Sequence, residues 1–212
     1  MLQKLLLSCG IFAPLLYLGT DLLAGKLHKG YSFSTQSMSE LGAAGSPTRP
    51  LVVALTLVAS ALMIAFGIGV WQAAGPAILP RIVAGLIFGN AVAGLAATLF
   101  FPNRFGVRPE FGTPGVLLMF LSVLCFVLAM VFGAAAFHGW MRFLSIAIPA
   151  AYVILAIMRF ATAASSAEGT NMLIGAQERT MAYSFLLWTM ALAIYLLLQT
   201  GQEIETTINI GR

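Results

Sequence analysis

The residues best suited to chemistry begin in a polar stretch that reads YSFSTQSMSELGAAGSPTRP over positions 31–50. Within it, Ser37 and Glu40 have the S-x-x-E spacing of a helix capping box, in which the serine hydroxyl and the carboxylate satisfy backbone amides at a helix start. This spacing predicts a short helix at the membrane interface, ended by Gly42. The alternative is functional: Glu40 transfers a proton or orients a ligand, assisted by Ser37 or Ser39.

A second polar cluster precedes and enters the last apolar run of the chain. It contains Arg159, Glu178 and Arg179. Neighbouring helical residues point about 100° apart, so Glu178 and Arg179 cannot both face lipid, and one of them is expected to turn inward. We predict that Glu178 or Arg179 meets Glu40 or Arg159 and forms the ion-paired floor of a pocket of headgroup size. The alternative is that these charged side chains extend to the lipid headgroups.

Asn90 lies near the middle of another apolar run, where a carboxamide needs hydrogen-bond partners. A hydrogen bond between helices is the favoured interpretation, and a ligand contact is the alternative. Glu40 and Glu178 are then the candidate catalytic acid/base residues, and the predicted ligand-binding set is Ser37, Ser39, Glu40, Asn90, Arg159, Glu178 and Arg179.

Metal and cofactor sites are not expected. The two cysteines, Cys9 and Cys125, fall at different depths of the predicted spans, and the two histidines, His28 and His138, fall at opposite ends. No Cys/His cluster has the spacing of a zinc site, and a bis-histidine haem site would need ligands on one side of the membrane. We therefore predict no metal and no cofactor.

The elements that must position these residues are membrane-spanning helices. Of the 212 residues, 60% are hydrophobic and only 8% are charged, whereas a soluble domain has about a quarter charged. Six long windows lack Asp, Glu, Lys and Arg. With each helix extending a few residues past its window, they account for six spans of the roughly 20 residues that cross a bilayer. The sequence predicts an all-α integral membrane bundle of six transmembrane helices, with a short interfacial helix in the first long loop. One domain over 1–212 is expected, with spans near 4–24, 51–73, 80–100, 114–136, 140–161 and 179–200.

Small residues recur every four positions in the third span, including Gly85, Gly89 and Ala93. Such spacing lets helix backbones approach closely. Packing inside the bundle is the favoured interpretation, and a homodimer through these residues is the alternative. The net charge of +4 suits contact with anionic membrane lipids. Because the basic residues are dispersed, nucleic acid is not an expected partner.

Several short motifs resemble one known family. They are SMSELGAAGSP after the first span, Phe101-Pro102 at the end of the third, and Gly175, Gln177-Glu178-Arg179 and Trp188 on entering the sixth. Together they resemble the prokaryotic six-span membrane family known as domain of unknown function 998, over essentially the whole chain. The resemblance implies a multi-pass protein of the prokaryotic plasma or inner membrane, without an established reaction. A histidine that often follows the Phe-Pro pair in that family is lacking here, where the sequence reads NRFGVRPEFGTPGV.

Two function classes follow from these observations. The first is a protein that binds a lipid or another amphipathic small molecule in an intramembrane pocket open to the face with the long loops. The absence of a complete set of nucleophile, base and orienting group favours it. The second is a membrane enzyme acting on a lipid headgroup, with Glu40 and Glu178 as acid and base and loop arginines holding a phosphate. A secondary transporter is a weaker third class, because the two halves show no inverted repeat.

Overall fold

The computed structural model describes residues 1–103, 112–165 and 174–210. Within these ranges, side chains are described except at 155–165, 174 and 201–210. Every regular element among the described residues is an α-helix. The helices are α1 (Leu2–Leu27), α2 (Met38–Leu41), α3 (Arg49–Ala73), α4 (Ile78–Phe100), α5 (Pro114–Ala136), α6 (Gly139–Ser165) and α7 (Ile174–Ile210).

Apolar composition and local breakers explain these helix boundaries. Proline stands in the first turn of α3 and of α5, where its missing N–H costs no hydrogen bond. The turn between α3 and α4 contains Gly75 at φ +51°, and α6 begins at Gly139 with φ +61°. Both values lie in the left-handed region that glycine adopts without a steric penalty, so the chain reverses there within a few residues.

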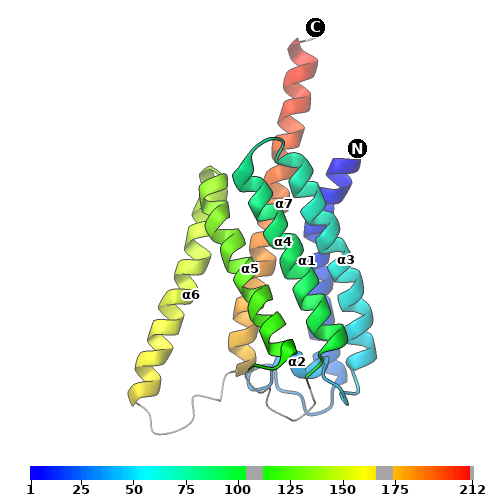
Figure 1. The fold of residues 1–212 in the computed structure, drawn as a ribbon, viewed down its shortest axis with the longest axis vertical. Coiled ribbons are helices and arrows are strands. Elements are labelled where there is room, and N and C mark those ends of the chain that lie inside the picture. The colour runs from blue at the N-terminus through cyan, green and yellow to red at the C-terminus, as the bar shows by residue number, and fades with distance from the viewer. Residues whose placement is uncertain (104–111, 166–173, 211–212) are drawn as a thin grey trace.

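The long helices run side by side and form an elongated bundle (Figure 1). The turns between α3 and α4 and between α5 and α6 lie at the end that also holds the N-terminus and the end of α7, whereas α2 and the loop after α1 lie at the opposite end. We call this opposite end the long-loop end.

Among the residues whose side chains are described, five helices are long and apolar enough to cross a membrane: α1, α3, α4, α5 and α7 over Gly175–Thr200. The described apolar part of α6 is shorter, Gly139–Ile154. The chain is therefore a multi-pass membrane protein. The helix α7 continues to Ile210, ten residues beyond the predicted end of the last span near 200.

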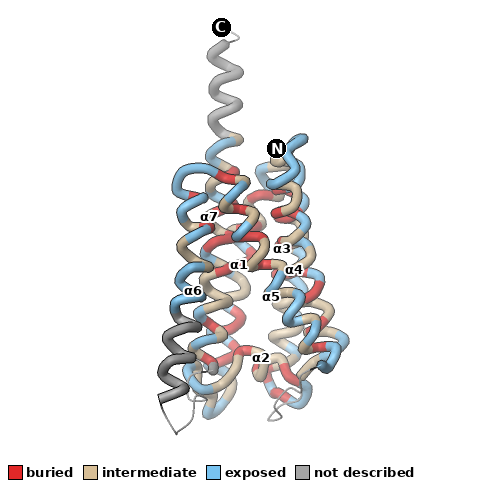
Figure 2. The backbone as a smooth tube through the Cα atoms, turned by 60° about the vertical axis from the view of Figure 1, so that its left-hand side comes forward, coloured by how far each residue is buried: buried red, intermediate tan, exposed pale blue. Residues whose placement is uncertain are grey.

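The buried core follows the centre of the bundle, and the outward faces are exposed (Figure 2). Large apolar side chains populate those outward faces, including Phe12, Phe88, Leu124 and Leu187, as expected where lipid replaces water. Close approach in the core depends on small residues. A Cβ added at Gly69 of α3 would lie 2.9–3.0 Å from atoms of Leu6 and Leu7 in α1.

Only part of the row of small residues in α4 packs against other helices of this chain. A Cβ at Gly89 would lie 3.3 Å from the sulfur of Cys125 in α5, and Ala93 is buried. Gly85 is exposed and would meet no atom within 4 Å. Gly89 thus packs α4 against α5, and a dimer through this row stays a prediction.

The first long loop contains the expected short helix. Ser37 is the N-cap of α2 and Gly42 its C-cap, as the sequence predicts. The hydroxyl of Ser37 accepts from the amide of Ser39, the second helical residue. In a capping box it would accept from the third, which here is Glu40. Met38 and Leu41 are buried, which means that α2 turns its apolar side chains into the end of the bundle.

Candidate functional site

A buried ion pair joins the first and last helices at the long-loop end. Nε and Nη2 of Arg179 in α7 donate to the two carboxylate oxygens of Asp21 in α1, at 2.9 and 2.8 Å. The side chains of Arg179 and Asp21 are 8% and 2% exposed. The hydroxyl of Tyr183, one turn further along α7, also donates to Asp21, at 2.5 Å. This two-point geometry is the strongest form of the arginine–carboxylate interaction.

The loop after α1 encloses the same guanidinium. Nη1 donates to the backbone oxygens of Phe33 at 2.6 Å and Gln36 at 3.1 Å, and Nη2 donates to the hydroxyl of Tyr31 at 2.6 Å. The guanidinium carbon also lies 4.8 Å from the centre of the Phe33 ring, which is cation–π distance. Burial raises the pKa of Tyr31 above its ordinary value, although the Arg179 hydrogen bond opposes part of that shift. Tyr31 therefore stays protonated and donates to the backbone oxygen of Ser37.

Gly175 allows the loop to lie against the start of α7. A Cβ at this position would collide with the backbone oxygen of Gln36 and would come within 2.6 Å of that of Phe33. Beside it, the amide of Ala176 donates to the oxygen of Ser34 at 3.0 Å. The loop therefore supplies a backbone acceptor to the first turn of α7, whose amides have no partner within the helix.

Glu178, the neighbour of Arg179, is held by α2 instead of by α1. Its carboxylate accepts from the hydroxyl of Ser37 and from the amide of Met38, the latter at 2.9 Å. Glu40 lies elsewhere and accepts from the side-chain amide of Gln36 at 3.2 Å. The two candidate acid/base residues thus have separate partners.

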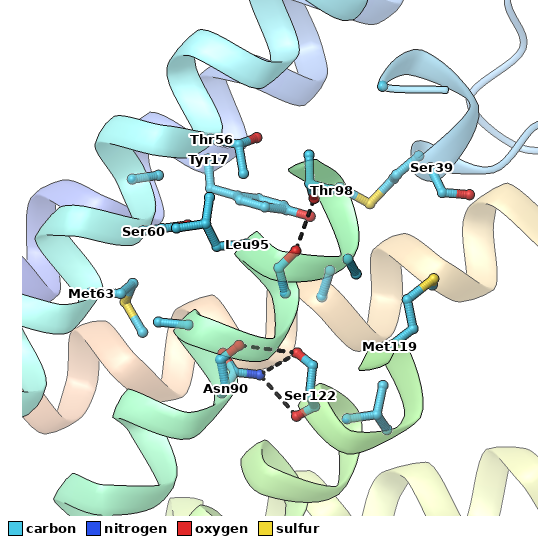
Figure 3. A pocket seen from close by; sticks show the side chains of 18 of the residues that line it. Tyr17, Ser39, Thr56, Ser60, Met63, Asn90, Leu95, Thr98, Met119 and Ser122 are labelled. Carbon is cyan, nitrogen blue, oxygen red and sulfur yellow. Dashed lines mark hydrogen bonds between the residues drawn. The ribbon is translucent and has the colours of Figure 1, made fainter. Parts of the chain in front are cut away.

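A cavity of about 350 Å³ lies beneath α2 and among five helices, a volume within the range of small-molecule sites, about 300–1,000 Å³. At the long-loop end it is bordered by α2, by Phe101-Pro102-Asn103 and by Glu178. It reaches inward to Met63, Asn90 and Ser122 (Figure 3). Most of its surface is apolar. The polar residues among those described as lining it are Tyr17, Ser39, Thr56, Ser60, Asn90, Thr98, Asn103, Ser122 and Glu178.

Asn90 combines the two interpretations that the sequence left open. Its side-chain nitrogen donates to the backbone oxygen of Ser122 at 2.9 Å and to the hydroxyl of the same residue at 2.8 Å. This hydrogen bond between α4 and α5 is drawn in Figure 3, where both residues also border the cavity. The carboxamide nitrogen is satisfied by the protein, and Asn90 lies at the inner end of the cavity.

The structure divides the predicted site residues into three groups. Ser39, Asn90 and Glu178 line the cavity. Ser37 is not in the described lining but donates a hydrogen bond to Glu178. Glu40 and Arg179 are absent from the described lining, and the ionic partner of Arg179 is Asp21 rather than Glu40. The side chain of Arg159 lies outside the residues whose side chains are described, so its predicted contact stays a prediction.

Three residues of this cluster were missed by sequence reasoning: Asp21, Tyr31 and Tyr183. A signal for Asp21 was present, because it is a lone carboxylate inside a long apolar helix, and such residues usually have a functional or structural partner within the bundle. Nothing in the spacing of Tyr31 and Tyr183 identifies them. Among the described residues, no group of three His, Cys, Asp or Glu side chains has the arrangement of a metal site.

Comparison with known proteins gives one match. No curated protein and no solved structure matches the chain. A family model described as "Protein of unknown function (DUF998)" matches residues 11–195, a range that includes the whole ion-pair cluster and the described lining of the cavity. The chain belongs to the DUF998 family.

Proposed function

We propose that this protein binds a lipid or another amphipathic small molecule in the cavity beneath α2. The observation that carries the proposal is the composition of the cavity wall, which is mostly apolar and includes one charged side chain among its described residues, Glu178 at the long-loop end. An amphipathic molecule has the same two-part character. Its chain would contact Met63, Phe126 and Phe185, while its head would lie near Glu178 and Asn103.

The position of the cavity supports this orientation. From Asn90 at its inner end to Phe101 at the end of α4 there are eleven helical steps, or roughly 16 Å. This distance is about half of the 30 Å hydrocarbon thickness of a bilayer. A bound molecule would therefore span one leaflet, with its head at the level of the headgroups, in the prokaryotic cell membrane that the family resemblance implies.

The experiment compares ligand retention in two variants that carry the same substitution. Ala182→Phe places a ring in the cavity wall one turn after Glu178, and Ala61→Phe places it on an exposed position of α3 outside the described lining. Each protein is solubilised gently and examined by native mass spectrometry, and the extracted lipids are identified by mass.

The expected result is one retained amphipathic species per wild-type chain, kept in Ala61→Phe and lost in Ala182→Phe. Equal retention in wild type and in Ala182→Phe would contradict the proposal, because the molecule would then be bound outside the cavity. Thermal unfolding of both variants checks that the ring has not simply unfolded the bundle.

A further inference from the structure

We infer that the head of the bound molecule is cationic, of the alkylammonium class, and that Glu178 is the group that recognises it. This inference rests on the proposed function, and it specifies which amphipathic molecule the cavity selects. It is carried by the separate environments of three charged residues at the long-loop end: Asp21, Glu178 and Arg179.

The positive charge of Arg179 is already neutralised by its partner. Arg179 forms the one ion pair found among the described residues, with Asp21. Its three nitrogens make six hydrogen bonds to protein acceptors, and a guanidinium has five N–H donors. No donor is left for a phosphate, so Arg179 cannot serve as the headgroup clamp that the enzyme hypothesis assumed.

The remaining charge is negative and borders the cavity. Glu178 is the only Asp, Glu, Lys or Arg among the described lining residues. The groups that hold it, Ser37 and the amide of Met38, are neutral, so its charge is not cancelled by them. The formal charges of Asp21, Glu178 and Arg179 sum to −1.

A negative charge in an apolar cavity selects strongly between ligand heads. Charges interact several times more strongly at the low effective dielectric of a protein interior than in water. A phosphate or carboxylate head would meet the Glu178 carboxylate as a like charge. An ammonium head would donate to it, and Ser39 and Asn103 in the same part of the wall offer further acceptors for its remaining N–H groups.

The test uses three single-chain probes with the same tail: dodecylamine, dodecanol and dodecyl phosphate. Each is titrated into the wild-type protein in nanodiscs of uncharged lipid, and binding is read by native mass spectrometry and by competition. Since a hydrogen bond to a charged group contributes about 1.5–3 kcal/mol, dodecylamine is expected to bind about tenfold or more tightly than dodecanol. Dodecyl phosphate is expected to be the weakest of the three.

Glu178→Gln keeps the size of the side chain and an oxygen for Ser37 and Met38, but removes the charge. It is expected to reduce the dodecylamine preference over dodecanol to within about twofold, a difference below that of one hydrogen bond. Ala182→Phe is expected to weaken binding of all three probes. Should Glu178→Gln fail to fold, the order of the three probes in the wild type still decides the question.

The outcomes separate the two proposals. Equal binding of the three probes, or tightest binding of dodecyl phosphate, with loss of all three in Ala182→Phe, would overturn the cationic head and leave the cavity as an amphipath site. Absence of binding by all three probes, or binding unaffected by Ala182→Phe, would overturn the proposed function as well.

Discussion

Glu178 and Arg179 are adjacent in sequence but act on different parts of the structure. Because successive side chains on a helix diverge by about 100°, Arg179 turns toward Asp21 and the loop, whereas Glu178 turns toward α2 and the cavity. One dipeptide thus supplies a structural ion pair and the charge of the proposed binding site. Substitutions at the two positions should therefore affect different properties, stability at 179 and ligand choice at 178.

The ion pair yields a prediction about stability. Asp21→Asn keeps the shape of the side chain but leaves the Arg179 guanidinium buried without its carboxylate, and removing one partner of a buried pair costs about 3–5 kcal/mol. We expect a marked fall in the unfolding temperature of the detergent-solubilised protein, measured by circular dichroism.

Lys26→Gln is the matched control for the loss of one charge on α1. Lys26 is exposed, and surface substitutions of this kind usually change stability by less than about 0.5 kcal/mol. If Asp21→Asn unfolded at the temperature of Lys26→Gln, the ion pair would not be a principal support of the long-loop end.

At the scale of residues, the sequence identified polar residues of this end of the bundle but not their pairings. Of the seven residues predicted to bind a ligand, Ser39, Asn90 and Glu178 lie in the cavity wall, and ligand binding by any of the seven stays a prediction. The sequence analysis paired Glu178 or Arg179 with Glu40 or Arg159, whereas Arg179 binds Asp21. Such pairings depend on the rotation of each helix about its axis. A rotation of about 100°, the angle between successive residues, brings a different side chain to face the centre of the bundle.

At the scale of elements, the end of the bundle depends on the contact between the first loop and α7. Backbone oxygens of the loop accept from Arg179 and Ala176, and the first amide of α2 donates to the carboxylate of Glu178. Gly175 permits this contact, because any side chain there would occupy the space of the loop backbone. The position of α2 above the cavity therefore depends on a residue in α7.

Gly175→Ala is expected to displace the loop and to destabilise the protein by about 1–3 kcal/mol, the usual cost of overpacking a close contact. Thermal unfolding measures the cost, and protease cleavage within residues 31–48 measures the release of the loop. Gly85→Ala is the control, since a Cβ there meets no atom within 4 Å; it should stabilise α4 by about 0.5–1 kcal/mol. Equal behaviour of the two variants would refute the role of Gly175.

A buried hydrogen bond between side chains connects α6 to α7. The indole nitrogen of Trp188, which is fully buried, donates to the hydroxyl of Ser145 at 2.9 Å. Ser145→Ala leaves that N–H without this partner, at an expected cost of about 1–2 kcal/mol. Unfolding temperature and the tryptophan emission maximum measure the effect. Ser8→Ala should be nearly neutral, because the described hydrogen bond of the Ser8 hydroxyl runs to the preceding turn of its own helix; a comparable loss there would contradict this account.

Element boundaries were largely predictable, because charge-free runs and Gly or Pro breakers determine where apolar helices begin and end. The last helix was not: α7 continues to Ile210 through polar residues that the hydropathy pattern excludes from a span. The close approach of α2 to the bundle was also not predicted, since it arises from tertiary contacts of Met38 and Leu41 rather than from their local sequence.

For the whole molecule, the arrangement of the helices makes a prediction about topology. The helix α6 has 27 residues, about 40 Å at 1.5 Å per residue, which exceeds the roughly 30 Å of hydrocarbon that a span must cross. Six crossings would place both termini on one side of the membrane, as they lie at one end of the bundle in Figure 1. Five crossings would place them on opposite sides.

Reporters of membrane side, fused separately to the N-terminus and to the C-terminus, test this count. We expect the two fusions to report the same compartment and a reporter inserted after Gly112, which lies in the connection from α4 to α5 and is exposed, to report the other. Opposite sides for the two termini would mean that α6 does not cross.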